Sequence, residues 1–273
     1  MKWLLSGPIA AFDTETTGTD VEQDRIVTAC VVMMAPQHPG QPWDQDVRSW
    51  LIDPGVDIPE AASAVHGITS AYAKEHGEQP EHALDQIADA LARLFAACLP
   101  IVVCNGAFDF TILDRELRRY GLSTLDARIG RPIGPVVDVY VIDKYVDQYR
   151  PGGRKLSNLV ATYDVRMDGA HDSTADAIAA ARVAYRMAQR SQEPRDALIR
   201  LYGGLGRRSP QEIADRWCDL GALSPTDLHD CQVIWREQQM TALHEFHERK
   251  GIKDGDYDPS WPMRPYPNQQ EPR

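Results

Sequence analysis

The chain has 273 residues, of which 43% are hydrophobic, and a formal net charge of −11 at pH 7. The acidic balance argues against a protein that coats nucleic acid without regard to sequence, because such binding depends on Lys and Arg neutralising phosphates. It does not exclude a protein that contacts only a few phosphates. No apolar run approaches the roughly 20 residues of a membrane helix, so we expect no membrane role.

The five cysteines are odd in number, lie far apart and include no CxxC pair. This pattern indicates neither a disulfide framework nor a zinc site. We therefore expect reduced thiols and a cytoplasmic location.

The first part of the chain predicts an antiparallel meander followed by helices. Three stretches that are apolar or alternating, and that are separated by turn residues, predict consecutive strands at 8–13, 25–35 and 47–53. Apolar residues at helical spacing then predict helices at 59–76 and 81–98. The apolar run 101–104 predicts a buried strand.

Helices and strands alternate in the next part. The patterns predict a helix at 110–120, a strand at 135–143 that leads into a helix, and a long Ala-rich helix at 173–190. Strands first and then alternating helices and strands imply an α/β domain over 1–190, with a mixed sheet covered by helices on both faces.

The pattern changes after residue 190. Only helices are predicted there, at 195–203, 209–220 and 225–250, so we interpret 191–253 as a helical extension. The segment 254–273 is rich in proline and is expected to be irregular.

The motif FDTETTG at 12–18 carries the first chemical signal. Period-two alternation places Asp13 and Glu15 on one face at the end of the first strand. Two neighbouring carboxylates stay ionised at low cost only when a cation neutralises them, which favours a divalent-ion site. An acidic strand end followed by a Thr-Gly turn is an equally good interpretation of this motif alone.

Two further acidic residues have both a chemical and a structural interpretation. Asp109 follows the buried strand 101–104, and taken alone it is better interpreted as the cap of the next helix. Asp176 forms a possible capping box with Ser173. His171 precedes Asp176 by five residues, so on one continuous helix the two would lie on different faces. We therefore expect His171 in the loop before the helix, turned toward Asp176, where a pKa of about 6.5 suits it to accept a proton.

Taken in order, these motifs resemble the DEDDh branch of the DEDD exonucleases. The resemblance rests on FDTETTG, on the NxxFDxxxL pattern from Asn105 through Phe108 and Asp109 to Leu113, and on the HxxxxD pattern of His171 and Asp176. It covers about 1–190 and extends to the segments 58–69 and 136–143. Each motif alone is weakly specific, but their ordered assembly is not expected by chance.

The resemblance implies an RNase H-like fold and a 3′→5′ exonuclease that removes nucleoside monophosphates from DNA by a two-metal mechanism. It implies that two divalent cations, Mg²⁺ or Mn²⁺, are held by the carboxylates, and that His171 takes the proton of the attacking water. The ligands would be Asp13, Glu15, Asp109 and Asp176.

The resemblance also implies contacts with the substrate. Glu15 and the backbone near Thr16 and Thr17 would lie close to the 3′ end. His66 would contact the substrate, although a helix-end histidine before a Gly stop is the alternative. Asn105 is expected to orient the loop that carries Asp109, and Phe108 to serve as a core or wedge residue beside the last bases.

The implied partners are single-stranded or frayed DNA 3′ ends and, because the family includes proofreading subunits, a DNA polymerase. Two alternatives stay open: an exoribonuclease of the same superfamily, and a non-catalytic nucleic-acid-binding module. For the basic residues outside the motifs, a solvated surface is favoured over nucleic-acid contact; these are Arg150, Arg154, Lys155, Arg207 and Arg208.

Overall fold

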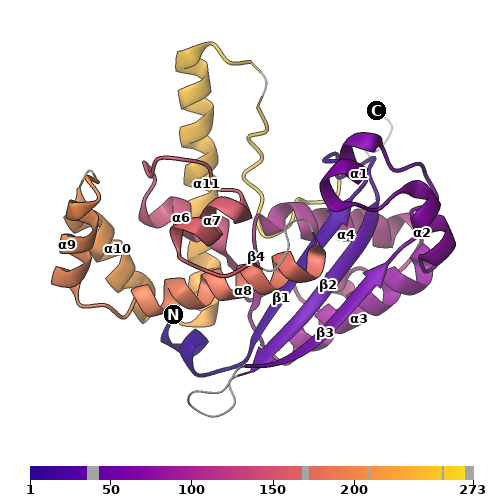
Figure 1. Cartoon of the computed structure of the whole chain (residues 1–273), viewed down its shortest axis with the longest axis horizontal. Coiled ribbons are helices and arrows are strands. Elements are labelled where there is room, and N and C mark those ends of the chain that lie inside the picture. The colour runs from indigo at the N-terminus through magenta and orange to yellow at the C-terminus, as the bar shows by residue number, and fades with distance from the viewer. Residues whose placement is uncertain (36–42, 168–171, 208, 254, 268–273) are drawn as a thin grey trace.

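The computed structural model describes residues 1–35, 43–167, 172–207, 209–253 and 255–267 (Figure 1). In these residues a five-stranded sheet has the order β3-β2-β1-β4-β5. The strands are β1 (Ile9–Thr16), β2 (Ile26–Ala35), β3 (Asp44–Leu51), β4 (Ile101–Val103) and β5 (Val136–Asp138). The first three pair antiparallel, and β4 pairs parallel with β1 and with β5. The predicted meander within a mixed sheet is confirmed.

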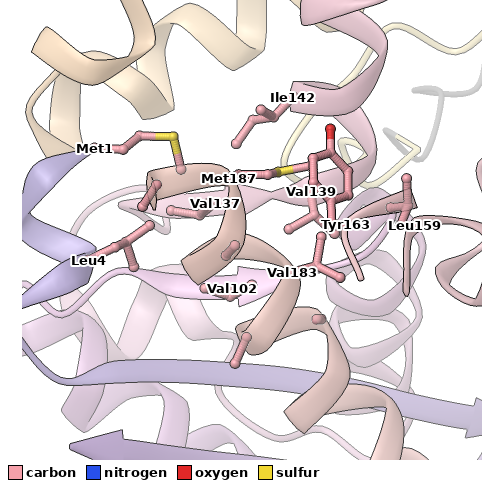
Figure 2. Close-up of a cluster of buried hydrophobic side chains, with 14 of the residues drawn as sticks. Met1, Leu4, Val102, Val137, Val139, Ile142, Leu159, Tyr163, Val183 and Met187 are labelled. Atoms are coloured by element: carbon pink, nitrogen blue, oxygen red, sulfur yellow. The ribbon is translucent and has the colours of Figure 1, made fainter. Parts of the chain in front are cut away.

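Helices cover both faces of the sheet, as the sequence predicts. Along β1, Ile9 and Ala11 contribute to one hydrophobic cluster, whereas Ala10 and Phe12 contribute to the other. The first cluster includes residues of α6 (Val139–Val146) and α8 (Ser173–Arg190), and Figure 2 shows part of it. The second includes residues of α3 (Pro80–Ala96) and α4 (Gly106–Arg119). The core strand β1 is therefore buried on both sides, with its carboxyl end at the edge of the two clusters.

The helix predicted at 59–76 is wrong as a single element. The structure contains α1 (Glu60–His66) and α2 (Ser70–His76), which are separated at Gly67. Gly67 has a φ of 78°, a left-handed conformation that ends a helix and that glycine adopts without steric cost. Thr69 then starts α2, because its side chain accepts a hydrogen bond from the amide of Tyr72.

The next helices also differ from the prediction in their bounds. Helix α4 begins at Gly106 rather than at 110, so Asp109 lies within its first turn and does not cap it. The strand predicted at 135–143 ends at Asp138, whose side chain caps α6. Two short helices were not predicted, α5 (Leu125–Ile129) and α7 (Leu156–Thr162).

The helices after α8 agree closely with the predicted ones: α9 (Arg195–Gly204), α10 (Pro210–Ala222) and α11 (Pro225–Lys250). They share the first hydrophobic cluster, to which Leu198, Trp217 and Leu228 contribute. A short 3-10 helix, η1 (Lys2–Leu5), belongs to the same cluster through Leu4. The later part of α11 projects beyond the rest of the molecule (Figure 1).

The described tail, 255–267, contains no helix or strand and returns along α11 toward α4 (Figure 1). The amide of Arg264 donates to the Thr111 hydroxyl at 2.9 Å, and Trp261 is buried. Within the described residues, no helix is long and apolar enough to cross a bilayer.

Candidate active site

Three of the predicted carboxylates converge at the carboxyl end of β1. Asp13 and Glu15 lie on the same face of this strand, and Asp176 lies in the first turn of α8. One carboxylate oxygen from each lies within 4.8 Å of the others. Strand alternation and the start of α8 therefore bring together acidic groups that are far apart in the chain.

Asp109 faces the same hollow from α4. Its Oδ1 accepts hydrogen bonds from the Thr14 hydroxyl at 2.7 Å and from the Thr14 amide at 3.2 Å. The hollow has a volume of about 570 Å³, and the four carboxylates form part of its lining. Other side chains that line it are Asn105, Phe108, Tyr140, Arg154 and Lys155.

Burial and neighbouring charges raise pKa values in this acidic cluster, which consists of Asp13, Glu15, Asp109 and Asp176. Burial raises the pKa of Asp13 well above its usual value, and the charges of Asp109, Asp176 and Glu15 add to the rise. Burial, followed by the charges of Asp176 and Asp172, raises the pKa of Glu15 to about 7. Ionising the whole cluster is therefore unfavourable unless a cation compensates the charge.

Burial likewise raises the pKa of Asp109 to about 7, although the hydrogen bond from Thr14 acts in the opposite direction. Asp13 and Glu15 receive no comparable help, because no side chain or amide in the described residues donates a hydrogen bond to their carboxylates.

The start of α4, which carries Asp109, is fixed by a buried carboxylate that the sequence pattern did not reveal. Asp138, at the end of β5, is fully buried and accepts hydrogen bonds from the amides of Asn105 at 2.9 Å and Gly106 at 3.0 Å. Asn105 has a left-handed φ of 70°, and a Cβ at Gly106 would lie 2.4 Å from the Val103 side chain. The start of α4 therefore requires both this backbone conformation and a glycine.

The extension and the tail complete the surroundings of Asp138. The Trp261 indole donates to its Oδ2 at 3.1 Å, and the Asp138 amide donates to the Gln232 side chain at 2.7 Å. The Tyr140 amide is a fourth donor to the carboxylate, at 3.0 Å. Sequence pattern could suggest Asp138 as a cap of α6, but it gives no sign of Trp261 or Gln232.

The capping box predicted for Ser173 and Asp176 is wrong. Asp172 is the N-cap of α8, and its Oδ1 accepts from the amides of Thr174 at 2.8 Å and Ala175 at 3.2 Å. Because Asp172 satisfies this helix end, the Asp176 carboxylate lies with those of β1 instead. The predicted base, His171, lies outside the described residues.

The predicted substrate-contacting residues lie at different distances from the cluster. Asn105 and Phe108 line its cavity. His66 lines a smaller hollow of about 260 Å³ together with Glu15, and its Nδ1 accepts from the Ile68 amide at 3.1 Å. The hydroxyls of Thr16 and Thr17 form turn contacts, with Gly18 O at 2.6 Å and Asp24 Oδ1 at 2.7 Å, and the Thr17 amide donates to the Arg25 carbonyl at 2.9 Å. The contact of their backbone with the 3′ end stays a prediction.

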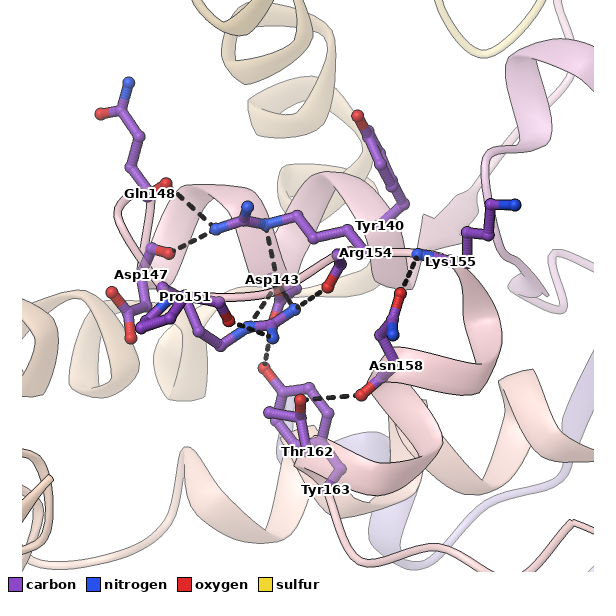
Figure 3. A network of polar contacts seen from close by, with 12 residues as sticks. Tyr140, Asp143, Asp147, Gln148, Pro151, Arg154, Lys155, Asn158, Thr162 and Tyr163 are labelled. Carbon is purple, nitrogen blue, oxygen red and sulfur yellow. Dashed lines mark hydrogen bonds and ion pairs between the residues drawn. The ribbon is translucent and has the colours of Figure 1, made fainter.

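The basic residues do not form a uniformly solvated surface. Arg150 is buried, and both it and Arg154 form ion pairs with the buried Asp143, at 3.0 and 2.9 Å (Figure 3). Arg207 pairs with Asp147 at 2.8 Å. The solvated interpretation is therefore wrong for Arg150. Lys155 is exposed at the rim of the cavity, and Arg208 lies outside the described residues.

A scan for known families finds that the model of the exonuclease family matches residues 10–184. The chain is 28% identical over 184 residues to the PolC-type DNA polymerase III of Lacticaseibacillus paracasei strain ATCC 334. That alignment covers 67% of this chain but 11% of the polymerase.

Solved structures of E. coli exonuclease I have a similar fold. The complex with a dT13 oligonucleotide matches with a TM-score of 0.52 and 18% identity, over 74% of this chain and 44% of the other. The zinc-bound complex with single-stranded DNA matches with a TM-score of 0.54 and 18% identity, over 71% and 43% of the two chains. The chain thus spans less than half of these proteins, and the match confirms the RNase H-like mixed sheet flanked by helices.

Proposed function

Because this chain belongs to the exonuclease family and carries the motifs of its DEDDh 3′→5′ branch, we propose that it hydrolyses the terminal phosphodiester bond at the 3′ end of DNA and releases nucleoside monophosphates. One observation carries the proposal: oxygens of Asp13, Glu15 and Asp176 lie within 4.8 Å of one another, and Asp109 lines the same cavity.

The side chains present fit divalent cations. Carboxylate oxygens are the ligands that Mg²⁺ and Mn²⁺ prefer, and the chain offers no hydrogen-bond donor to Asp13 or Glu15 within its described residues. We propose that the four carboxylates of the acidic cluster hold two Mg²⁺ or Mn²⁺ ions. Bound cations of this kind acidify water and neutralise charge on the phosphate oxygens during displacement at phosphorus.

The remaining roles belong to the chain itself. Thr14 holds the Asp109 carboxylate in place through two hydrogen bonds, and we propose that His171 accepts the proton of the attacking water. The Phe108 ring, at the cavity wall, would pack against the last base. The backbone of Thr16 and Thr17 and the His66 ring would contact the terminal sugar, and Asn105 would position the loop before Asp109.

For the substrate, we propose single-stranded or frayed DNA 3′ ends. The exonuclease I structures with a similar fold contain single-stranded DNA, and the relative from L. paracasei is a DNA polymerase. A polymerase is therefore the protein partner that we propose, for a role in proofreading or repair. The unpaired cysteines of the structure suit the reducing cytoplasm.

We also propose the domain organisation given by the sequence pattern: the exonuclease domain at 1–190, a helical extension at 191–253 and the tail at 254–273. The family match, which ends at residue 184, supports the first boundary.

The proposal is tested with 5′-labelled single-stranded DNA and RNA of one sequence, incubated with Mg²⁺. We expect the DNA to shorten from its 3′ end one nucleotide at a time, with mononucleotides as product, and Asp13→Ala to be inactive. Faster degradation of RNA would instead identify a ribonuclease. Binding of the strand without cleavage would identify a non-catalytic module.

A further inference from the structure

Apart from the cavity of the acidic cluster, a hollow lies between α6 and α11, and we call it the second hollow. Its volume is about 230 Å³, and its lining includes Lys144, Tyr145, Trp235 and Gln238. Tyr140 lines the cavity of the acidic cluster, and Lys144 follows it on α6 after one helical turn, about 6 Å farther along at about 1.5 Å per residue. The cavity of the acidic cluster and the second hollow are therefore lined by residues on successive turns of α6.

Lys144 is the cation that this hollow offers to a ligand. Within the described part of the chain, no carboxylate lies within ion-pair distance of its ammonium group, which lies over the Tyr140 ring at 5.7 Å. Burial, and then the like charges of Arg154 and Arg236, lower the pKa of Lys144 to about 8. An anion beside the ammonium group would relieve this repulsion.

Two neighbouring arginines, Arg154 and Arg216, are already occupied, and the third, Arg236, is buried. The Arg154 guanidinium pairs with Asp143 and donates to the carbonyls of Asp147 at 2.7 Å and Gln148 at 3.0 Å (Figure 3). Arg216 pairs with Glu212 and donates to the Tyr145 carbonyl. These groups raise the local positive potential, but their donors serve the fold.

An aromatic pair forms one wall of the hollow. The rings of Tyr145 and Trp235 are stacked, with centroids 3.7 Å apart and planes inclined by 9°. Both residues are half-buried, and the Arg216 guanidinium lies over the Tyr145 ring, 5.3 Å from its centroid. A positive charge beside aromatic faces is the combination by which proteins bind unpaired nucleic-acid strands, because bases stack on the rings while cations pair with phosphates.

We propose that the hollow between α6 and α11 is a second nucleic-acid subsite, which holds the single strand behind its 3′-terminal nucleotide. Lys144 pairs with a backbone phosphate, and the Tyr145–Trp235 pair supports a base. The inference rests on the proposed exonuclease function and adds the route of the strand. A position one helical turn from Tyr140, which lines the cavity of the acidic cluster, favours the substrate strand over a protein partner as occupant.

The test compares a long and a short substrate. The long one is single-stranded dT20, and the short one is the p-nitrophenyl ester of thymidine 5′-monophosphate, which cannot reach from the acidic cluster to the second hollow. For Lys144→Glu and Trp235→Leu, we expect the ratio of kcat/KM on dT20 to that on the ester to fall about tenfold. Lys144→Met, which keeps the apolar stem, lowers the salt dependence of dT20 binding by about 0.7 in log–log slope.

Arg93→Glu is the matched control, because it makes the same charge change at an exposed residue of α3 that lines neither hollow. Binding is measured by fluorescence anisotropy of labelled dT20 in an Asp13→Asn background, and thermal unfolding verifies that each variant is folded. An unchanged substrate ratio together with an unchanged salt slope in Lys144→Met would overturn the subsite. A wild type that hydrolyses neither substrate would overturn the proposed function instead, while the anisotropy still tests the subsite.

Discussion

Buried and half-buried carboxylates occur in two kinds of surroundings in this molecule. Asp138 receives four hydrogen bonds, from three amides and one indole, and Asp143 is bound by two arginines and by the Tyr163 hydroxyl (Figure 3). Asp13 and Glu15, in contrast, face other carboxylates, whose charges add to the rise in pKa that burial causes. In the first kind, hydrogen-bond donors and arginines of the chain compensate the negative charge, and these contacts stabilise the fold. In the second kind, the negative charge requires a cation from outside the chain.

The largest expected effect comes from a substitution in the acidic cluster, which is the second kind of surroundings. Asp13→Asn removes one ligand of the acidic cluster, and we expect the rate of DNA hydrolysis to fall by more than about 100-fold, since loss of even an outer-shell partner of a metal site costs about 10- to 100-fold. The same change removes charge repulsion, so in EDTA the free energy of unfolding should stay the same or rise. Nuclease assays and urea denaturation measure the two quantities. A strong loss of stability in EDTA would contradict the comparison.

The next largest effect comes from a substitution of Asp138, which represents the first kind of surroundings. Asp138→Ala leaves the amides of Asn105 and Gly106 and the Trp261 indole without their acceptor, so we expect the free energy of unfolding to fall by about 3 kcal/mol. Activity should fall with it, because the start of α4 positions Asp109. Trp261→Phe, which removes only one donor, should cost about 1 kcal/mol. Equal stability of wild type and Asp138→Ala in urea denaturation would show that this carboxylate does not hold the loop.

The smallest effect concerns pH. The pKa of Glu15 is raised from 4.5 to about 7 in the folded chain, so its protonated form favours folding at low pH and this contribution is lost as pH rises through that interval. In EDTA, the free energy of unfolding of wild type minus that of Glu15→Gln should therefore decrease between about pH 4.5 and 7. Addition of Mn²⁺ should restore it at higher pH, because cations replace protons on the cluster. A difference that is flat or rises with pH in EDTA would refute the shift.

Local pattern predicted most of the sheet and the shared face of Asp13 and Glu15, whereas Asp109 and Asp176 joined the predicted cluster only through the resemblance to the DEDDh exonucleases. Alternation along β1 fixes the face of Asp13 and Glu15, and the order of strands and helices fixes the layers. The mixed sheet and the long helix α8 follow from such short-range signals. The sequence also suggested a single helix at 59–76, because the apolar spacing continues across Gly67, although that glycine ends α1.

The error at the start of α4 has a physical reason, which is the long range of the contacts that fix it. Asp138 accepts hydrogen bonds from amides that lie 33 and 32 residues earlier in the chain and from an indole that lies 123 residues later. No periodic pattern records contacts of that range, so the start of α4 at Gly106 could not be predicted. At the start of α8, two acidic residues compete for one cap, and only the structure shows that Asp172 takes it.

The position of Trp261 in the chain has a consequence for synthesis. A ribosome releases β1, α4 and β5 long before it adds the indole that completes the hydrogen bonds of Asp138. The nascent chain can therefore build its sheet early, but the wall behind Asp109 is finished only when the tail has emerged. If synthesis stopped before Trp261, the start of α4 would lack the indole that donates to Asp138.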